Sequence, residues 1–229
     1  KLNEAGIKSN FINGLRVTDN KSIKIVEEVL SIFNSEITKA LKINGCDSQG
    51  ITNQQNNIIT VEQENKSLGY VGTPKEISQS AIEKIVKEKK VPVIAPLGLD
   101  INNQVFNINA DTAAGAIAKK LNARRLIIMS DVEGVLDNNK KLISEINTDK
   151  INELIKNEII SGGMIPKIKN CLDVASNGVK GVCIIDGRLD HSILFELLSN
   201  AGSGTLIREW MKELIEIKYW IFDLDNTLY

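Results

Sequence analysis

The chain has 229 residues, of which 42% are hydrophobic and 25% charged, and its formal net charge is -1. This length suffices for one large hydrophobic core or two small ones. The near-neutral balance, without a basic stripe, argues against a nucleic-acid or membrane partner and favours a small molecule. Three cysteines without CxxC spacing and one histidine argue against a disulfide framework or a zinc site. We therefore expect reduced thiols and a cytoplasmic protein.

Helices alternate with short apolar strands, the pattern of a mostly parallel sheet covered by helices on both faces. The first predicted helix carries an apolar stripe at Ile23, Val26, Leu30 and Phe33. The other predicted elements are a short helix from Ser35, a loop at 49–57, a strand at 58–61 with a hairpin partner near Tyr70, a helix at 82–89, strands at 91–95 and 104–108, a helix at 110–121, a strand at 125–129, helices at 149–157 and 164–175, a strand at 181–185 and a helix at 190–199.

The most informative segment is 107–121, where a strand ends in amide side chains and a helix begins with a carboxylate. Asn109 is the predicted N-cap of that helix. Asn107 and Asp111 then lie at the carboxyl end of a strand, where open α/β sheets bind ligands. The alternative is a capped helix that has no role in ligand binding. The helix presents one apolar face, formed by Ala110, Ala114, Ile117 and Leu121.

Two further loops carry chemistry. The turn at 130–137 follows a strand and offers backbone N–H groups and carboxylates, so it is suited to a nucleotide; a plain turn with solvated acids is the alternative. In the loop at 161–167, paired glycines let a helix N-terminus approach an anion. Because the helix dipole opposes a cation there, Lys167 is favoured only if an anionic ligand lies between them, and a solvent-facing lysine is the alternative. No Walker-type loop and no GxGxxG occurs.

Six short segments occur in one order along the chain: NGLRVT at 13–18, GYVG at 69–72, NINAD at 107–111, SDV with a glycine at 130–134, GGM with a lysine at 162–167, and GTLI at 204–207. In this order and spacing the sequence resembles the amino acid kinase family over residues 1–207. The resemblance is strongest to the branch that phosphorylates acetylated glutamate. It implies an α/β fold, a three-layer αβα sandwich with a mostly parallel central sheet.

The resemblance also implies an activity and a site. The reaction would transfer the γ-phosphoryl group of ATP, accompanied by Mg²⁺, to the side-chain carboxylate of N-acetyl-L-glutamate in arginine biosynthesis. Arg16 would clamp the substrate α-carboxylate through two parallel charge-assisted bonds, and Asn107 and Asn109 would bind the same substrate. Asp111 would orient the catalytic lysines, and Lys167 would neutralise charge on the transferring phosphoryl group.

The residues that would frame the nucleotide are Asp131, Val132, Glu133, Gly134, Val135, Leu136, Ile159, Ile160 and Ser161. The resemblance assigns no protein ligand to a metal. It implies a homo-oligomer, either a dimer or a hexamer.

The sequence departs from the family at both ends. It begins at Lys1 without an initiator Met, and the family's Lys-x-Gly-Gly strand and a glycine-triplet strand would lie upstream. We therefore expect a longer protein, with this fragment alone inactive. Residues 208–229 read as a linker helix followed by a strand that resembles the first motif of haloacid dehalogenase-like hydrolases, with Asp223 as nucleophile and Asp225 as acid/base. An amphipathic helix with a chance acidic tail is the alternative.

Two hypotheses from different classes remain: an enzyme of this kinase branch, and a non-catalytic relic that binds nucleotide or amino acid without turnover. The codons upstream of Lys1 discriminate between them, because a Lys-x-Gly-Gly strand supports the enzyme. A kinase for aspartate, carbamate or a nucleoside monophosphate is a weaker alternative, against which the segment at 13–18 argues.

Overall fold

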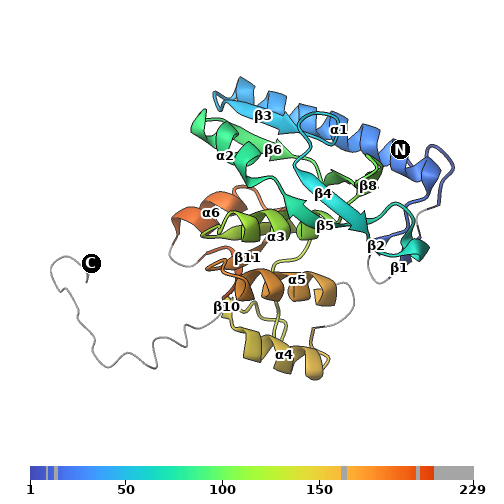
Figure 1. The fold of residues 1–229 in the computed structure, drawn as a ribbon. Helices are drawn as coiled ribbons and strands as arrows, with labels where there is room; N and C mark the ends of the chain where they lie inside the picture. The colour runs from blue at the N-terminus through green and yellow to red at the C-terminus, as the bar shows by residue number, and fades with distance from the viewer. Residues whose placement is uncertain (9, 13–14, 161–163, 200–201, 209–229) are drawn as a thin grey trace.

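The computed structural model describes residues 1–8, 10–12, 15–160, 164–199 and 202–208, which form an α/β fold (Figure 1). The helices are α1 (Asn20–Ile43), α2 (Gln79–Lys87), α3 (Ala110–Lys120), α4 (Thr148–Lys156), α5 (Met164–Ser176) and α6 (Ser192–Leu198), with a 3₁₀ turn at Lys66–Leu68. The strands are β1 (Phe11–Ile12), β2 (Leu15–Arg16), β3 (Ser48–Ile51), β4 (Ile59–Gln63), β5 (Gly72–Ile77), β6 (Val91–Ile94), β7 (Leu97–Leu99), β8 (Val105–Asn107), β9 (Leu126–Ser130), β10 (Glu145–Ile146), β11 (Val182–Asp186) and β12 (Gly204–Ile207).

The α/β class predicted from the sequence is confirmed, and the predicted strands β4, β6, β8, β9 and β11 lie within two residues of their expected bounds. Over the described residues the strands form four sheets, in the orders β1-β2, β3-β6, β5-β4-β7-β8 and β10-β12-β11-β9. Parallel pairing joins β3 to β6 and β9 to β11, strands that helices separate in the chain. Hairpin-like neighbours such as β4 and β5 pair antiparallel, so the two four-stranded sheets are mixed where a mostly parallel sheet was expected.

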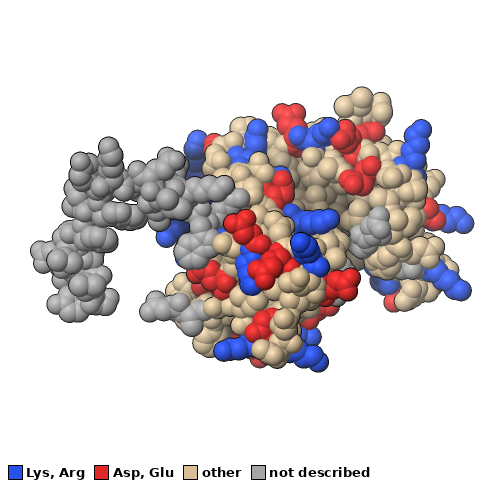
Figure 2. All heavy atoms as spheres, turned by 90° about the horizontal axis from the view of Figure 1, so that it is seen from below, with Lys and Arg blue, Asp and Glu red and all other residues tan. Residues whose placement is uncertain are grey.

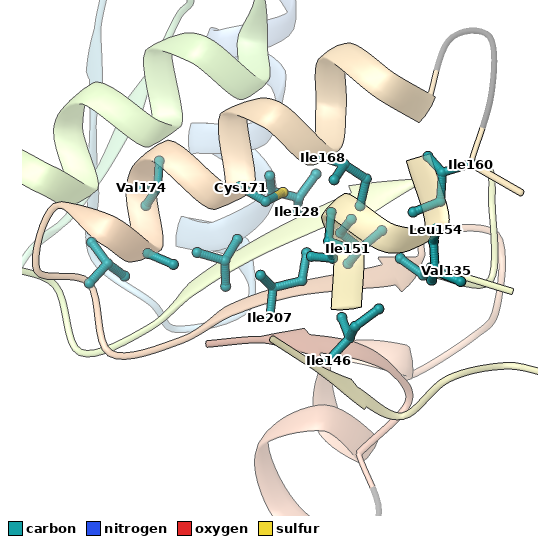
Figure 3. Packing of buried hydrophobic residues seen from close by; sticks show 14 of the residues in the cluster. Ile128, Val135, Ile146, Ile151, Leu154, Ile160, Ile168, Cys171, Val174 and Ile207 are labelled. Atoms are coloured by element: carbon teal, nitrogen blue, oxygen red, sulfur yellow. The ribbon is translucent and has the colours of Figure 1, made fainter. Parts of the chain in front are cut away.

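Helix α3 joins two hydrophobic cores. Its Ala113 belongs to the core built on β4, β5, β8 and α2, and its Ala118 belongs to the core built on β9, β11, α4 and α5. Figure 3 shows the second core, which includes Ile128, Ile151, Ile168, Cys171 and Ile207. A Cβ on Gly115 would lie 2.7 Å from Val174, so glycine lets α3 pack closely on α5. Contacts with both cores therefore fix the position of α3.

The predicted apolar face of α3 is not its most buried face. Those residues line a cavity of about 370 Å³ beside β6 and the start of β9, together with Ala113 and Ala118, which are almost fully buried. The apolar pattern identified the helix correctly. Ile117 and Leu121 of that face pack against the first core, while small residues of α3 make the closer contacts with α5 and β5, and small side chains weigh little in a hydrophobic pattern.

Helix α1 is unbroken from Asn20 to Ile43, so the predicted second helix from Ser35 is wrong. Its N-cap Asp19 accepts a hydrogen bond from the backbone N–H of Ser22 at 2.7 Å. The predicted stripe is wrong at Phe33, whose side chain is 56% exposed. The neighbouring Asn34 is buried instead, because its side-chain amide donates hydrogen bonds to backbone carbonyls of the sheet.

Strand β3 occupies part of the stretch that was expected to be a loop. It pairs in parallel with β6, and the hydroxyl of Ser48 donates to the carbonyl of Thr38 at 3.0 Å. Polar residues form this strand because tertiary pairing outweighs propensity. Strands β7, β10 and β12 were also missed, since segments of two to four residues are too short to show a strand pattern.

Asn34 links α1 to the sheet. Its side chain is 6% exposed, and Nδ2 donates to the carbonyl of Val93 at 2.8 Å. Asn34→Ala is expected to lower the free energy of unfolding by about 1–3 kcal/mol, because the carbonyl of Val93 loses this donor. Urea denaturation measures this, with exposed Ser35→Ala on the same helix as the control. Equal midpoints for the two variants would show that the bond is dispensable.

Charges of both signs lie on the face of the molecule that one space-filling view shows (Figure 2). On the face seen in Figure 2, acidic and basic side chains are interspersed, which does not favour a polyanionic partner. Within the described residues, no helix has the length and apolar character needed to cross a bilayer. The hydrolase-like motif with Asp223 and Asp225 lies in residues 209–229, outside the described part of the chain, and that resemblance stays a prediction.

Candidate active site

Three segments that are distant in sequence meet next to Asn107. Thr18 donates its backbone N–H to the carbonyl of Leu68 and accepts from the N–H of Tyr70 at 2.7 Å. The carbonyl of Tyr70 in turn accepts from the N–H of Asn107 at 2.9 Å. Gly69 has φ +68°, and a Cβ there would lie 2.3 Å from the carbonyl oxygen of Thr18, so the crossing requires glycine. The backbone thus places the segment that carries Arg16 against the end of β8.

Arg16 and Asn107 line one cavity of about 440 Å³, whose wall includes apolar side chains of α1: Ile25, Val26, Val29 and Leu30. The guanidinium of Arg16 lies 4.7 Å from the centre of the Phe11 ring. A guanidinium and a primary amide beside an apolar wall suit a small ligand that carries a carboxylate, an amide-like group and a short aliphatic part.

The sequence analysis did not assign a role to Thr18, which is fully buried. Its hydroxyl donates to the carbonyl of Arg16 at 3.1 Å and accepts from the Asn107 amide at 3.5 Å. Thr18 therefore joins the two predicted substrate residues. Its place at the end of the segment 13–18 was the one available signal.

Asp111 and Lys167 form an ion pair between two helix starts. Lys167 Nζ lies 2.5 Å from Asp111 Oδ2, and the side chains are 19% and 24% exposed, respectively. Asn170, one turn later on α5, donates to the backbone carbonyl of Asp111 at 2.9 Å. Asp111, which the α3 dipole favours, supplies a negative charge to Lys167, so this lysine does not simply face solvent; an anionic ligand at the same helix start stays a prediction.

Cys171 lies one turn after Lys167 on α5 and is fully buried. Burial, aided by the charge of Asp111, raises the pKa of its thiol to about 12. Burial and the hydrogen bond that Cys183 donates to Glu196 raise the pKa of that thiol to about 12 as well. Neither thiol is a nucleophile at neutral pH.

This difference among the cysteines is testable. At pH 8, iodoacetamide should alkylate the partly exposed Cys46 in the native protein and leave Cys171 and Cys183 unmodified until urea is added. Peptide mass spectrometry after timed labelling measures the three rates. Native labelling of Cys171 as fast as that of Cys46 would contradict the packing of α5.

The predicted nucleotide loop has an exposed and a buried half. Asp131 and Glu133 are exposed, whereas Val135 is 1% exposed and shares the second core with Ile160 (Figure 3). The backbone N–H of Val135 is taken by the hydroxyl of Thr205 at 2.8 Å, so it is not offered to a nucleotide as the sequence suggested. Ile159 also packs against this core, and Ser161 lies outside the described residues.

A fixed ion pair lies beside the start of this loop, and the sequence analysis did not identify it. Arg188 Nε and Nη2 donate to the two carboxylate oxygens of Asp186 at 2.8 and 2.7 Å. These bonds lower the pKa of Asp186 to about 2, so the carboxylate is charged at any ordinary pH. Gly187 donates its N–H to the carbonyl of Ser130 at 2.7 Å, which joins the ends of β11 and β9.

A preorganised lysine beside a carboxylate is suited to phosphoryl transfer, which needs positioning and charge rather than a protein nucleophile. A sequence model of the amino acid kinase family matches residues 1–186. The acetylglutamate kinase of Pelagibacter ubique (strain HTCC1062) is 68% identical over 209 residues, which are 91% of this chain and 73% of that protein. The chain belongs to the amino acid kinase family and is a phosphotransferase.

Further comparisons agree. The acetylglutamate kinase of Campylobacter fetus subsp. fetus (strain 82-40) is 42% identical, over 90% of this chain and 75% of that protein. The crystal structure of smu.665 from Streptococcus mutans UA159 has a TM-score of 0.78 at 30% identity, covering 90% of this chain and 80% of that one. N-acetylglutamate synthase from Neisseria gonorrhoeae has a TM-score of 0.81 at 21% identity, covering 91% and 48%, and shows the fold alone.

Proposed function

We propose that this kinase transfers the γ-phosphoryl group of ATP to the side-chain carboxylate of N-acetyl-L-glutamate, giving an acyl phosphate and ADP, as a step of arginine biosynthesis in the cytoplasm. The observation that carries the proposal is the β8–α3 junction. There Asn107 shares a cavity with Arg16, and Asp111, in the first turn of α3, holds Lys167. The names of the two acetylglutamate kinases support the choice of acceptor.

On the substrate side, Arg16 would clamp the α-carboxylate and Asn107 would bind the acetamido group. The apolar residues of α1 in the same cavity would contact the aliphatic part of the substrate. Asn109 caps α3 by accepting from the N–H of Thr112 at 3.1 Å. The same Asn109 oxygen also accepts from the Thr112 hydroxyl at 3.3 Å, so a side-chain contact of Asn109 with the substrate would be made through its amide nitrogen.

In the reaction, an oxygen of the acceptor carboxylate would attack the γ-phosphorus, and the bond from that phosphorus to the β-phosphate oxygen would break, releasing ADP. Lys167 would neutralise charge on the transferring phosphoryl group. Asp111 would keep the ammonium of Lys167 oriented toward that group. No protein nucleophile is needed. The proposed nucleotide frame is 131–136 with 159–161.

Magnesium would enter with the nucleotide. The described residues contain no cluster of three or more His, Cys, Asp or Glu that could hold a metal ion. Mg²⁺ retains water readily and is commonly held by nucleotide phosphates with few protein ligands. We therefore treat Mg·ATP as the substrate.

We also propose that the protein is a homo-oligomer, a dimer or a hexamer. Helix α1 exposes several large apolar side chains: Ile32 at 51%, Phe33 at 56%, Ile37 at 37% and Ile43 at 74%. Apolar residues gathered along one helix favour contact with another protein surface. Analytical ultracentrifugation tests this state directly.

Residues 1–229 alone are expected to be inactive, so the function is tested on the longer protein expected from the sequence, and the kinetic experiments below use the same protein. ADP release is measured with a set of acceptors: N-acetyl-L-glutamate, L-glutamate, L-aspartate and carbamate. Hydroxylamine converts an acyl phosphate to a hydroxamate and so separates carboxyl phosphorylation from ATP hydrolysis. We expect hydroxamate with N-acetyl-L-glutamate alone. Binding of Mg·ADP without any turnover would favour the non-catalytic alternative, and turnover with another acceptor would reassign the substrate.

A further inference from the structure

The buried half of the loop 131–136 is held by one hydroxyl group from β12. Thr205 is fully buried, and its Oγ1 accepts from the backbone N–H of Val135 at 2.8 Å and donates to the carbonyl of Ile143 at 2.7 Å. Val135 and Ile143 are also joined directly, by a backbone hydrogen bond of 2.9 Å. One hydroxyl thus ties the end of the loop to the returning chain and to the sheet.

The chain before Val135 passes directly over this hydroxyl. Gly134 has φ +144°, and a Cβ there would lie 2.5 Å from Thr205 Oγ1. The anchor itself cannot shift easily. A Cβ on the neighbouring Gly204 would lie 2.0 Å from the carbonyl oxygen of Ile184, so β12 packs tightly on β11. The hydroxyl therefore sits on a rigid strand.

The exposed and anchored parts of the loop are contiguous. Asp131 and Glu133 face solvent immediately before the buried Gly134 and Val135. At the other end, Ser130 is fixed to Gly187 at 2.7 Å. A short segment held at both ends has few conformations left, so the position of its exposed residues is set by its anchors.

We propose that Thr205 is a positioning residue for the nucleotide: its hydroxyl holds Val135 and so presents the exposed residues 131–133 in the geometry that binds ATP. Thr205 belongs to the family-like segment GTLI at 204–207, which lies beyond residues 1–186 matched by the family model. The proposal rests on the proposed function, because it takes this loop as the nucleotide frame.

The decisive variant is Thr205→Val, which keeps the branched shape and removes the hydroxyl. It leaves the N–H of Val135 and the carbonyl of Ile143 unpaired in the interior, and the loop must move to solvate them. We expect KM for ATP to rise about tenfold, which corresponds to about 1.4 kcal/mol. Turnover at saturating ATP and KM for N-acetyl-L-glutamate should stay near those of the unmodified protein.

The conservative variant Thr205→Ser keeps the hydroxyl and should restore most of the ATP affinity. Thr38→Val is the matched control: Thr38 also donates from its hydroxyl to a backbone carbonyl, that of Asn34 at 2.8 Å, but on α1. It should leave KM for ATP unchanged. If Thr205→Val does not fold, Gly134→Ala probes the same anchor, because its new methyl group would push the loop away from Thr205.

The role of Thr205 is tested by steady-state kinetics with ATP and acceptor varied separately, together with calorimetric titration of Mg·ADP. A selective rise in KM for ATP that Ser reverses supports the proposal. A lower melting temperature with an unchanged KM for ATP, or an equal rise in both KM values, overturns it and leaves Thr205 a structural residue. If the unmodified protein phosphorylates N-acetyl-L-glutamate but loop variants at Asp131 and Glu133 bind Mg·ADP normally, the loop assignment fails while the kinase function stands.

Discussion

Lys167→Ala is expected to lower turnover by about 10²- to 10³-fold, the effect of removing one preorganised donor to a developing charge. The structure gives the physical reason. Lys167 is held 2.5 Å from Asp111 at the start of α5, so its ammonium is oriented before the reaction begins. A group that acts mainly on the transition state changes turnover more than KM. Hydroxamate formation at saturating ATP and acceptor measures the effect.

The control for this variant is Lys169→Ala, which removes an exposed lysine from the same helix and should leave turnover unchanged. Circular dichroism must show that Lys167→Ala is folded, since the change leaves Asp111 without its ion pair. Turnover equal to that of Lys169→Ala would remove Lys167 from the catalytic residues.

The β8–α3 junction could be predicted from the sequence because its determinants are local. Asn109 caps the helix that begins at the next residue, and its partner Thr112 is three residues away. Strand β8 ends at Asn107, one residue before the predicted end at Ile108. Such signals come from residues a few positions apart in the sequence, so they can be interpreted without knowing the rest of the fold.

Contacts between distant residues could not be predicted in the same way. The hydroxyl of Thr205 meets Val135 across 70 positions of sequence, and Lys167 meets Asp111 across 56. Local reasoning therefore gave Lys167 a ligand where the fold gives it a carboxylate. It also offered the N–H of Val135 to a nucleotide, although the sheet already uses it. The family resemblance named the segments of the candidate site but not which atoms within them are already engaged.

The same limit explains the errors in α1 and β3. The helical pattern placed Phe33 in the core and ignored Asn34, yet Asn34 is buried because a carbonyl of β6 accepts its hydrogen bond. Hydrophobicity ranks side chains by their transfer from water, and it cannot register a polar group whose partner is supplied by another strand.

Arg16→Ala is expected to raise KM for N-acetyl-L-glutamate by about 10- to 150-fold, the equivalent of roughly 1.5 to 3 kcal/mol for a charge-assisted bidentate contact. Turnover at saturating acceptor should change much less, because the α-carboxylate lies away from the reacting group and is bound in both ground and transition states. Arg16→Lys keeps the positive charge but lacks the planar guanidinium. Its KM for N-acetyl-L-glutamate should therefore fall between those of the unmodified protein and Arg16→Ala. Arg124→Ala, at an exposed arginine before β9, is the matched control. Steady-state kinetics with the acceptor varied at saturating ATP give these values. If Arg16→Ala and Arg124→Ala have the same KM for the acceptor, the cavity beside Asn107 does not hold the substrate carboxylate.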